Sequence, residues 1–475
     1  MFLGIDLGTG SCKALLLKSD GTILAEASEA YSVQAPRPGW AESDPLDWWQ
    51  AVGRAVRAVV NRRAAEIRAI GLSGQMHGVV LADARGTPLY PTILWADGRA
   101  VAELEALHKL SPAQRQRLAN PPVVGMAAPS LLWLKRHQPK LYQAARWALQ
   151  PKDWLRLRLT KEAASEPSDA SGTLLYDLQA DSWAWDVIEA LELHPGLLPP
   201  LIPSSQIAGT LHQEAARHLG LLEGIPVAAG AADTAAALLG SGLQVGEAQL
   251  TVGTGAQITV LLAEPKVDPT LRTHLYRAAL PGQWYAMAAM QNAGLALEWV
   301  RALLGLSWEQ AYQEAQTAPA GCEGLVFLPY LTGERTPHLD PLARGVWAGL
   351  GRHHQRSHLM RAALEGVAFS LREGLEALGE VIPPHAPLRM AGGGTAHPFW
   401  QQMLADVLER PLIVNPVRSA SARGAAMLGA LALQIPIQNP SPLPANTLPS
   451  GADYRAGYLR FKKLYNRLTD WFKAR

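Results

Sequence analysis

The alternation of apolar and polar positions predicts short strands and amphipathic helices, and one strand pattern occurs twice. Residues 2–17 read FLGIDLGTGSCKALLL, with apolar, β-prone runs on both sides of a Gly-Thr-Gly turn. Residues 249–262, QLTVGTGAQITVLL, repeat that pattern. Each stretch predicts a strand, a tight turn and a second strand, so the second half of the chain echoes the first.

Strands and helices alternate along the rest of the chain, as in an α/β protein. The pattern predicts strands over residues 67–72, 79–82, 92–95, 226–230 and 388–391, and helices over residues 45–65, 352–375, 398–408 and 454–472. Helical periodicity also dominates up to about residue 145, and residues 287–300 indicate a strand followed by a helix. The apolar positions of the last helix step by four and three, which predicts a face that docks onto the protein.

A chain of 475 residues exceeds one hydrophobic core, and we expect two lobes. The glycines within residues 240–246 suggest a boundary, with an N-terminal lobe over residues 1–243 and a C-terminal lobe over residues 244–475. A proline-rich connector is predicted over residues 436–449. The hydrophobic share of 48% and the charged share of 18% are typical of a soluble globular protein.

Charge and cysteine content narrow the class of protein further. The 43 Lys and Arg residues are scattered and nearly balance the 41 Asp and Glu residues, so we expect neither nucleic acid nor membrane as a partner. Cys12 and Cys322 lie in different halves and support neither a disulfide framework nor a metal cluster. The chain shows no signal peptide pattern and no long apolar span, so we expect a cytoplasmic location.

The two Gly-Thr-Gly turns are candidates for binding a polyphosphate. Backbone N–H groups in such turns can hold anionic oxygen, and threonine hydroxyls add donors. Only the first copy has a carboxylate before its turn, Asp6, where the second copy has Thr251. A carboxylate beside phosphate requires a divalent cation such as Mg²⁺ between them, which makes Asp6 a candidate metal ligand. The structural alternative is two ordinary hairpins.

Three other segments place chemistry at strand ends, where open α/β sheets bind ligands. Polar residues 73–78, SGQMHG, follow one predicted strand. Asp233 begins an Ala-rich helix, either as an N-cap or as a functional carboxylate. The glycines at 392–394 follow a third strand and would form a plain turn or admit a ring or phosphate against bare backbone. The sequence contains no P-loop GK and no GxGxxG motif, which excludes those nucleotide sites.

Taken together, the motifs resemble the FGGY carbohydrate kinases, and within them the bacterial xylulokinases. The resemblance rests on DLGT at 6–9, GWAESDPLDWW at 39–49, SGQMHG, WADGR at 95–99, PKDWLRLRLT at 151–160, TGERTPH at 332–338 and the three glycines. It implies an α/β fold of the actin-like (ribonuclease H-like) type, a duplicated two-lobed ATPase with ATP and sugar between the lobes.

The resemblance also implies roles for individual residues. It makes Asp233 the general base, and Asp6 and Asp233 the Mg²⁺-side carboxylates. The implied sugar-binding residues are Met76, His77, Trp95, Arg99, Asp233 and Thr234, and the implied nucleotide-binding residues are Gly8, Thr9, Gly10, Ser11, Lys13, Gly253, Thr254, Gly255, Gly392, Gly393 and Gly394. Three positions depart from the family pattern: Gly10-Ser11 replaces Ser-Gly, Ser130 replaces a lysine, and Thr234 stands where asparagine often follows the catalytic aspartate.

The implied reaction is transfer of the γ-phosphoryl group of ATP to a terminal hydroxyl of a ketopentose, with D-xylulose as the leading acceptor. D-ribulose, another ketose or a polyol are alternatives, and a homodimer is the candidate assembly. An actin- or chaperone-like switch ATPase without a sugar acceptor shares the Asp-Leu-Gly-Thr opening and is the rival from another class. The QMHG segment at 75–78 favours the kinase.

Overall fold

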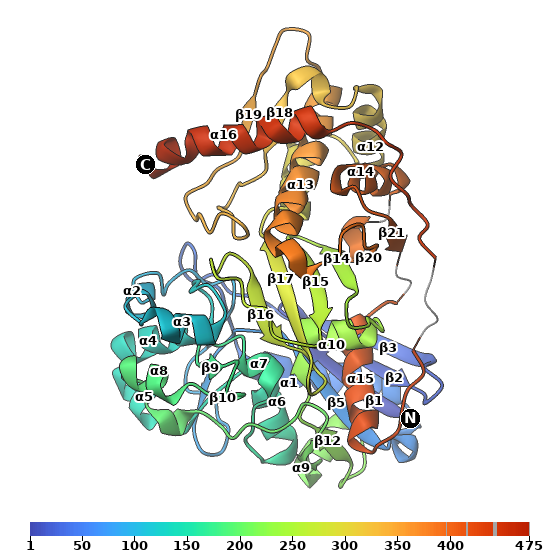
Figure 1. Ribbon diagram of the computed structural model, residues 1–475. Coiled ribbons are helices and arrows are strands. Elements are labelled where there is room, and N and C mark those ends of the chain that lie inside the picture. The colour runs from blue at the N-terminus through green and yellow to red at the C-terminus, as the bar shows by residue number, and fades with distance from the viewer. Residues whose placement is uncertain (396, 415–416, 440–443, 475) are drawn as a thin grey trace.

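The computed structural model describes residues 1–395, 397–414, 417–439 and 444–474, and these form two α/β lobes (Figure 1). The first lobe is built on a sheet with the strand order β11-β12-β5-β1-β2-β3, and the short β13 pairs with β5. The second is built on a sheet with the order β16-β17-β15-β14-β20-β21. The strands of the first sheet are β1 Phe2–Leu7, β2 Ser11–Leu17, β3 Ile23–Ala30, β5 Ala69–Gly74, β11 Ile207–Thr210, β12 Pro226–Ala228 and β13 Ala231–Ala232; those of the second are β14 Ala248–Val252, β15 Ala256–Leu262, β16 His274–Arg277, β17 Trp284–Met290, β20 Leu388–Ala391 and β21 Leu412–Val414.

The two sheets confirm the internal repeat. In the first, β1 is antiparallel to β2 and parallel to β5, and β5 is parallel to β12. In the second, β14 is antiparallel to β15 and parallel to β20, and β20 is parallel to β21. Each glycine-rich turn therefore joins a central strand of its own sheet, β1 or β14, to an antiparallel neighbour, and the predicted actin-like, duplicated α/β fold is confirmed.

Helices and four small strand pairs surround the two sheets. The helices are α1 Pro45–Val60, α2 Leu104–His108, α3 Pro112–Leu118, α4 Ala127–His137, α5 Pro139–Ala144, α6 Pro151–Thr160, α7 Pro167–Ala170, α8 Trp185–Ala190, α9 Gln213–Leu219, α10 Asp233–Gly240, α11 Gly294–Leu303, α12 Trp308–Thr317, α13 Arg356–Leu378, α14 Pro398–Leu408, α15 Ala420–Ala432 and α16 Arg455–Lys473. The pairs are β4 Glu42–Ser43 with β7 Thr92–Ile93, β6 Val80–Ala82 with β8 Trp147–Leu149, β9 Tyr176–Asp177 with β10 Ser182–Trp183, and β18 Val326–Leu328 with β19 Val346–Ala348.

Several predicted boundaries were wrong. The helix predicted over residues 45–65 ends at Val60, because Asn61 adopts a positive φ of 47° that ends the helical path. The helical region before residue 145 is four separate helices, and prolines begin two of them. Part of the predicted connector, residues 440–443, lies outside the described residues.

Helix α15, which the hydrophobic pattern did not reveal, packs against the sheet of the first lobe. It lies beside β1 and β5 although it comes from the last quarter of the chain (Figure 1). Glycines make this close approach possible: a Cβ on Gly4 would lie 2.0 Å from the carbonyl oxygen of Ala422, and one on Gly71 would lie 1.7 Å from that of Ala425. The contact ties the end of the chain to its beginning.

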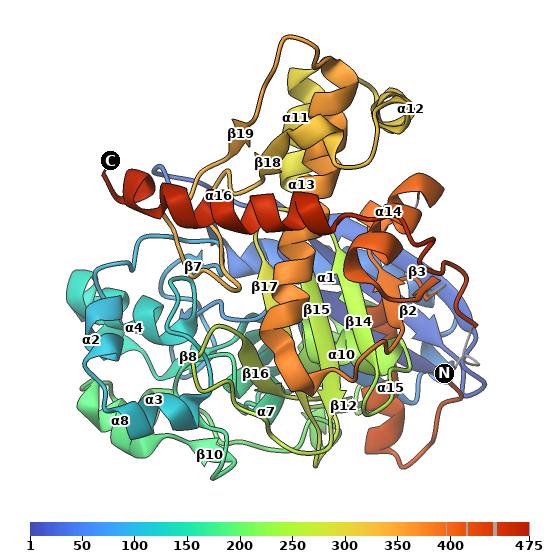
Figure 2. The same ribbon diagram turned by 45° about the horizontal axis from the view of Figure 1, so that its top comes forward.

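The last helix, α16, docks as its apolar stripe predicts. Tyr458, Phe461, Tyr465 and Phe472 are buried. The helix lies across α13, where Phe461 contacts Phe369 with 5.6 Å between ring centroids (Figure 2). None of the helices in the described parts of the chain has the length and apolar character that crossing a bilayer requires.

Candidate functional site

Asp6 lies near the end of β1, on the face of the sheet that α15 covers. Successive side chains of a strand alternate between its faces, and Gly4, two residues earlier, contacts α15. The Ser73 hydroxyl donates a hydrogen bond of 3.0 Å to Asp6 Oδ1, and Lys13 stands opposite Asp6 on β2. Burial raises the pKa of Asp6, and the Ser73 hydrogen bond and the Lys13 charge act against that rise.

Asp233 is the first residue of α10, and the N-cap position belongs to Ala232, so the N-cap interpretation of Asp233 was wrong. The backbone N–H of Thr234 donates to Asp233 Oδ1 over 2.6 Å, and the Thr234 hydroxyl donates to the same oxygen over 3.2 Å. Burial, followed by the negative charge of Asp6, raises the pKa of Asp233 to about 7. The charge of Asp6 thus disfavours ionisation of Asp233, and the two carboxylates offer the hard oxygen ligands that a divalent cation takes.

A buried polar network holds the backbone before Asp233. The sequence analysis did not predict this network. The Ser168 hydroxyl accepts a 2.9 Å hydrogen bond from the N–H of Ala232 and donates one of 2.8 Å to Glu166. Lys152 lies 3.3 Å from Glu166 and 2.6 Å from Asp153, and all three side chains are fully buried. The PKDW motif contained two of these residues, but nothing in the sequence linked them to the chain before Asp233.

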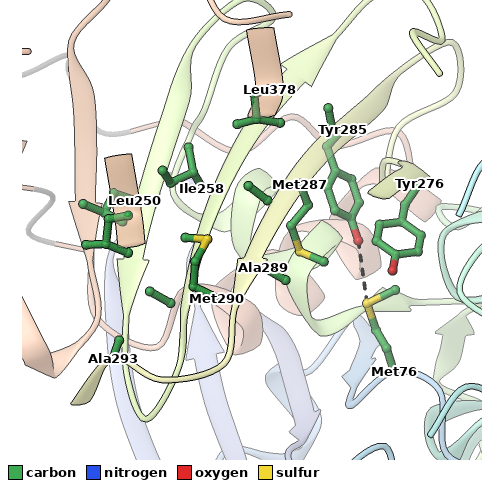
Figure 3. Close-up of a cluster of buried hydrophobic side chains, with 14 of the residues drawn as sticks. Met76, Leu250, Ile258, Tyr276, Tyr285, Met287, Ala289, Met290, Ala293 and Leu378 are labelled. Carbon is green, nitrogen blue, oxygen red and sulfur yellow. Dashed lines mark hydrogen bonds between the residues drawn. The ribbon is translucent and has the colours of Figure 1, made fainter. Parts of the chain in front are cut away.

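Met76 and His77 follow β5 and meet residues of the second lobe. The Tyr285 hydroxyl donates to Met76 Sδ over 3.6 Å (Figure 3). His77 Nδ1 lies 2.7 Å from the carbonyl oxygen of Gly172, and burial lowers the pKa of His77 to about 4. The imidazole is therefore neutral near pH 7, and because Nδ1 donates to a carbonyl, Nε2 is left as an acceptor for a hydroxyl.

Trp95 and Arg99, both expected to bind sugar, occupy different environments. Trp95 is 39% exposed, and its indole N–H donates to the Thr9 hydroxyl over 2.9 Å, which joins a predicted sugar-binding residue to the first glycine turn. The Arg99 side chain is 1% exposed and forms ion pairs of 2.6 Å with both Asp97 and Glu42. The Arg99 guanidinium is thus bound by Asp97 and Glu42 and secures the loop that carries Trp95.

The two glycine segments of the second lobe adjoin each other. The N–H groups of Gly294 and Leu295 at the start of α11 donate to the carbonyl oxygens of Gly253 and Thr254, over 3.0 and 2.9 Å. On the other side, a Cβ on Gly392 would lie 2.3 Å from the carbonyl oxygen of Val252, directly before that turn. The predicted nucleotide-binding residues 253–255 and 392–394 therefore form one backbone-lined region.

The corresponding turn of the first lobe is compact and open to solvent. The N–H of Gly8 donates to the carbonyl oxygen of Ser11 over 3.0 Å, and Gly10 is exposed with open space on its Cβ side. Lys13, two residues beyond the turn, is also exposed. This geometry suits a turn that meets a ligand from outside the sheet.

Arg335, in the loop after β18, is a further candidate site residue. The sequence analysis did not predict a role for it, although the TGERTPH segment contains it. Its guanidinium lies 5.8 Å from the centroid of the Trp95 ring in the other lobe. Its charge contributes to the lowered pKa of His77. Beside it, burial raises the pKa of Glu334 to about 7. Arg335 thus brings a cation of the second lobe to Trp95 and His77, two predicted sugar-binding residues of the first.

The fold is that of a two-lobed, actin-like sugar kinase, and family models confirm the class. The model for the FGGY family of carbohydrate kinases, N-terminal domain, matches residues 1–240, and the C-terminal domain model matches residues 248–433. The chain belongs to the FGGY family of carbohydrate kinases. It is therefore an ATP-dependent enzyme acting on a small-molecule sugar, and the switch-ATPase alternative was wrong.

Individual relatives sharpen the comparison. The chain is 37% identical to the xylulose kinase of Escherichia coli, over 98% of this chain and 99% of that one. It is similar to the solved xylulose kinase of Rhodospirillum rubrum, with 31% identity, a TM-score of 0.87 and 99% of both chains covered. A gluconate kinase of Lactobacillus acidophilus matches with a TM-score of 0.91 at 25% identity, over 98% of this chain and 97% of that one. Because kinases named for different acceptors share the fold, the acceptor has to be inferred from the site.

Proposed function

We propose that this protein is a xylulose kinase, which transfers the γ-phosphoryl group of ATP to a terminal hydroxyl of D-xylulose and releases D-xylulose 5-phosphate and ADP. The observation that carries this proposal is the near full-length similarity to the xylulose kinase of Escherichia coli, at 37% identity. The Met76-His77 pair supports it, since a neutral imidazole can accept a hydrogen bond from a sugar hydroxyl.

Asp233 is the proposed general base. A sugar hydroxyl is a poor nucleophile at neutral pH, and a positioned carboxylate can take its proton as the bond to phosphorus forms. Both hydrogen bonds from Thr234 go to Oδ1, which leaves Oδ2 as the oxygen that accepts the proton. A pKa of about 7 lets Asp233 accept this proton near neutral pH and release it after transfer.

Mg²⁺ is the proposed cofactor, held by Asp6 with Asp233 beside it. When bound, the cation would neutralise phosphate charge and allow both carboxylates to ionise together. The glycine turns at 8–10 and 253–255, with Ser11 and Lys13, are proposed to hold the phosphates. The backbone at Gly392–Gly394 is proposed to receive the adenosine.

Water exclusion is the proposed task of the residues that meet across the two lobes. Attack of water on ATP would waste the nucleotide, so the site should be complete only with sugar present. Arg335 faces Trp95, and Tyr285 contacts Met76, so these pairs are placed to close over an acceptor. The division at residues 243 and 244, the homodimer and the cytoplasmic location are further proposals.

An ADP-release assay tests the acceptor. Initial rates with D-xylulose, D-ribulose, L-ribulose, D-fructose, gluconate, xylitol, glycerol and no sugar should give the highest kcat/KM for D-xylulose. A site that binds hydroxyls through buried polar groups rejects an inverted isomer because those groups lose their partners. Preference for D-ribulose by about tenfold, or about 1.4 kcal/mol, would overturn the xylulose assignment and leave the sugar kinase intact.

A further inference from the structure

A pocket lies in the first lobe, apart from the residues proposed for catalysis. Its volume is about 630 Å³, and it is enclosed by the last turn of α6, by α9 and the residue before it, by Trp49 of α1 and by the turn after β6. Helices α6 and α9 lie at the lower end of the molecule in Figure 1. None of the lining residues belongs to the proposed sugar, nucleotide or metal sites. The volume is within the range of about 300–1,000 Å³ typical of small-molecule sites.

The charges lining this pocket are mainly positive. Arg85, Arg158 and Lys161 contribute three cations against the single carboxylate of Glu214. That carboxylate lies 4.0 Å from Lys161, and both side chains are mostly exposed. Among the residues that the structure describes, neither Arg85 nor Arg158 has a carboxylate within ion-pair distance. Two guanidinium groups therefore line one cavity without a carboxylate in direct contact.

Buried polar atoms in the pocket wall also lack partners. Arg158 Nε and His212 Nδ1 are shielded from solvent, and neither forms a hydrogen bond within the described parts of the chain. His212 Nε2 lies 3.0 Å from the carbonyl oxygen of Arg158, which fixes the imidazole at this position. The Arg158 guanidinium lies 5.3 Å from the centroid of the Trp49 ring, which stacks on His218 at 4.1 Å. Solvent does not reach these two atoms, so a ligand in the pocket would meet the outer nitrogens of the Arg158 guanidinium, which the Trp49 ring helps to hold in place.

We propose that this pocket is a binding site for a phosphorylated small molecule of about the size of a pentose phosphate. Guanidinium groups pair with phosphate oxygens through two parallel hydrogen bonds, and Arg85 and Arg158 supply two such groups. Lys161 adds a third cation at the rim. The cavity is larger than one phosphate requires, so it leaves room for the organic part of the ligand. Free phosphate is smaller but offers the same anionic oxygens to the two guanidinium groups.

Calorimetric titration of the full chain tests this proposal with three probes: D-ribose 5-phosphate, inorganic phosphate and D-ribose. The wild type should bind D-ribose 5-phosphate and should not bind D-ribose at the same concentrations. The double variant Arg85→Gln/Arg158→Gln should weaken phosphate-dependent binding by about tenfold or more, because two charged partners are lost. The double variant Arg62→Gln/Arg63→Gln removes two exposed arginines outside the pocket and should bind like the wild type.

The probes also distinguish the sources of the phosphate. Tighter binding of D-ribose 5-phosphate than of inorganic phosphate would support a sugar phosphate ligand, and equal affinity, lost in the pocket variant, would support a phosphate site that ignores the sugar. Unchanged binding in Arg85→Gln/Arg158→Gln would overturn the proposal, as would equal losses in both double variants. Sugar phosphorylation without the probe should stay within about twofold of wild type in the pocket variant, which verifies that it folds and separates this test from that of the proposed reaction.

Discussion

Replacing Asp233 with asparagine should sharply lower turnover and at the same time stabilise the protein in a pH-dependent way. Burial and the charge of Asp6 raise the pKa of this carboxyl to about 7, against 3.8 for the unperturbed group. Between these two pH values the unfolded chain ionises while the folded site keeps its proton. The wild type therefore loses stability as pH rises from about 4 to about 7, and the loss is complete above the folded pKa.

The size of the effect follows from the pKa difference. Each pKa unit corresponds to about 1.4 kcal/mol, so the ionisation penalty should grow by about 2.7 kcal/mol between pH 5 and the folded pKa near 7. The carboxamide introduced by Asp233→Asn has no such penalty and keeps an oxygen that can accept the hydrogen bonds from Thr234. Any pH-independent effect of the substitution cancels when its effects at two pH values are compared. The entropy of unfolding of a 475-residue chain gives about 1 °C per kcal/mol, so the advantage of Asp233→Asn in Tm should rise by about 3 °C from pH 5 to pH 8.

Thermal unfolding of both proteins at pH 5 and pH 8, without nucleotide or Mg²⁺, measures this difference. The variant Asp44→Asn, at the exposed N-cap of α1, controls for the loss of one carboxylate elsewhere. Turnover of Asp233→Asn should fall by about 10²- to 10⁴-fold, the range of general-base catalysis. A Tm difference between Asp233→Asn and wild type that is the same at both pH values would show that Asp233 is not a destabilised, protonated carboxyl and would refute the reasoning.

Three further substitutions test neighbouring features. Asp6→Asn should raise the Mg²⁺ concentration needed for half-maximal rate, and an unchanged Mg²⁺ dependence would remove Asp6 from the metal site. Because the substitution also removes a negative charge, it should lower the pKa of Asp233, so the metal-free Tm should vary less with pH. Ser168→Ala leaves the N–H of Ala232 without its buried acceptor and should lower kcat by about tenfold with little change in KM. Ser168→Thr keeps the hydroxyl and should restore kcat. An equal rise in KM would contradict a role confined to positioning Asp233. Gly424→Ala would place a Cβ 1.9 Å from a carbonyl oxygen of α10. The overpacking cost of about 1–3 kcal/mol should outweigh the helix-propensity gain of about 1 kcal/mol, so the Tm should fall. A Tm at or above that of the wild type would show that α10 and α15 can separate.

Features set by neighbouring residues could be predicted from the sequence alone. The two hairpins follow from apolar runs flanking Gly-Thr-Gly, and the start of α10 at Asp233 follows from a strand pattern running into alanines. The docking face of α16 follows from its spacing by four and three. Strand and helix periodicities act within about ten residues, so the pattern of side chains specifies them without knowledge of the fold.

Features that depend on burial and on distant partners were decided only by the tertiary structure. The hydrogen bond between Ser73 and Asp6 joins residues 67 positions apart, and the one from Ala232 to Ser168 joins residues 64 positions apart. The packing of helix α15 on the first sheet could not be predicted from the sequence, because its small residues give little contrast between an apolar and a polar face. These residues instead allow the backbones of the helix and the sheet to approach closely. The raised pKa of Asp233 likewise needs both its burial and the charge of Asp6, which lies 227 positions earlier in the chain. The sequence specifies which chemical groups are present, whereas desolvation and charge proximity, which set their reactivity, arise only when the folded chain brings distant segments together.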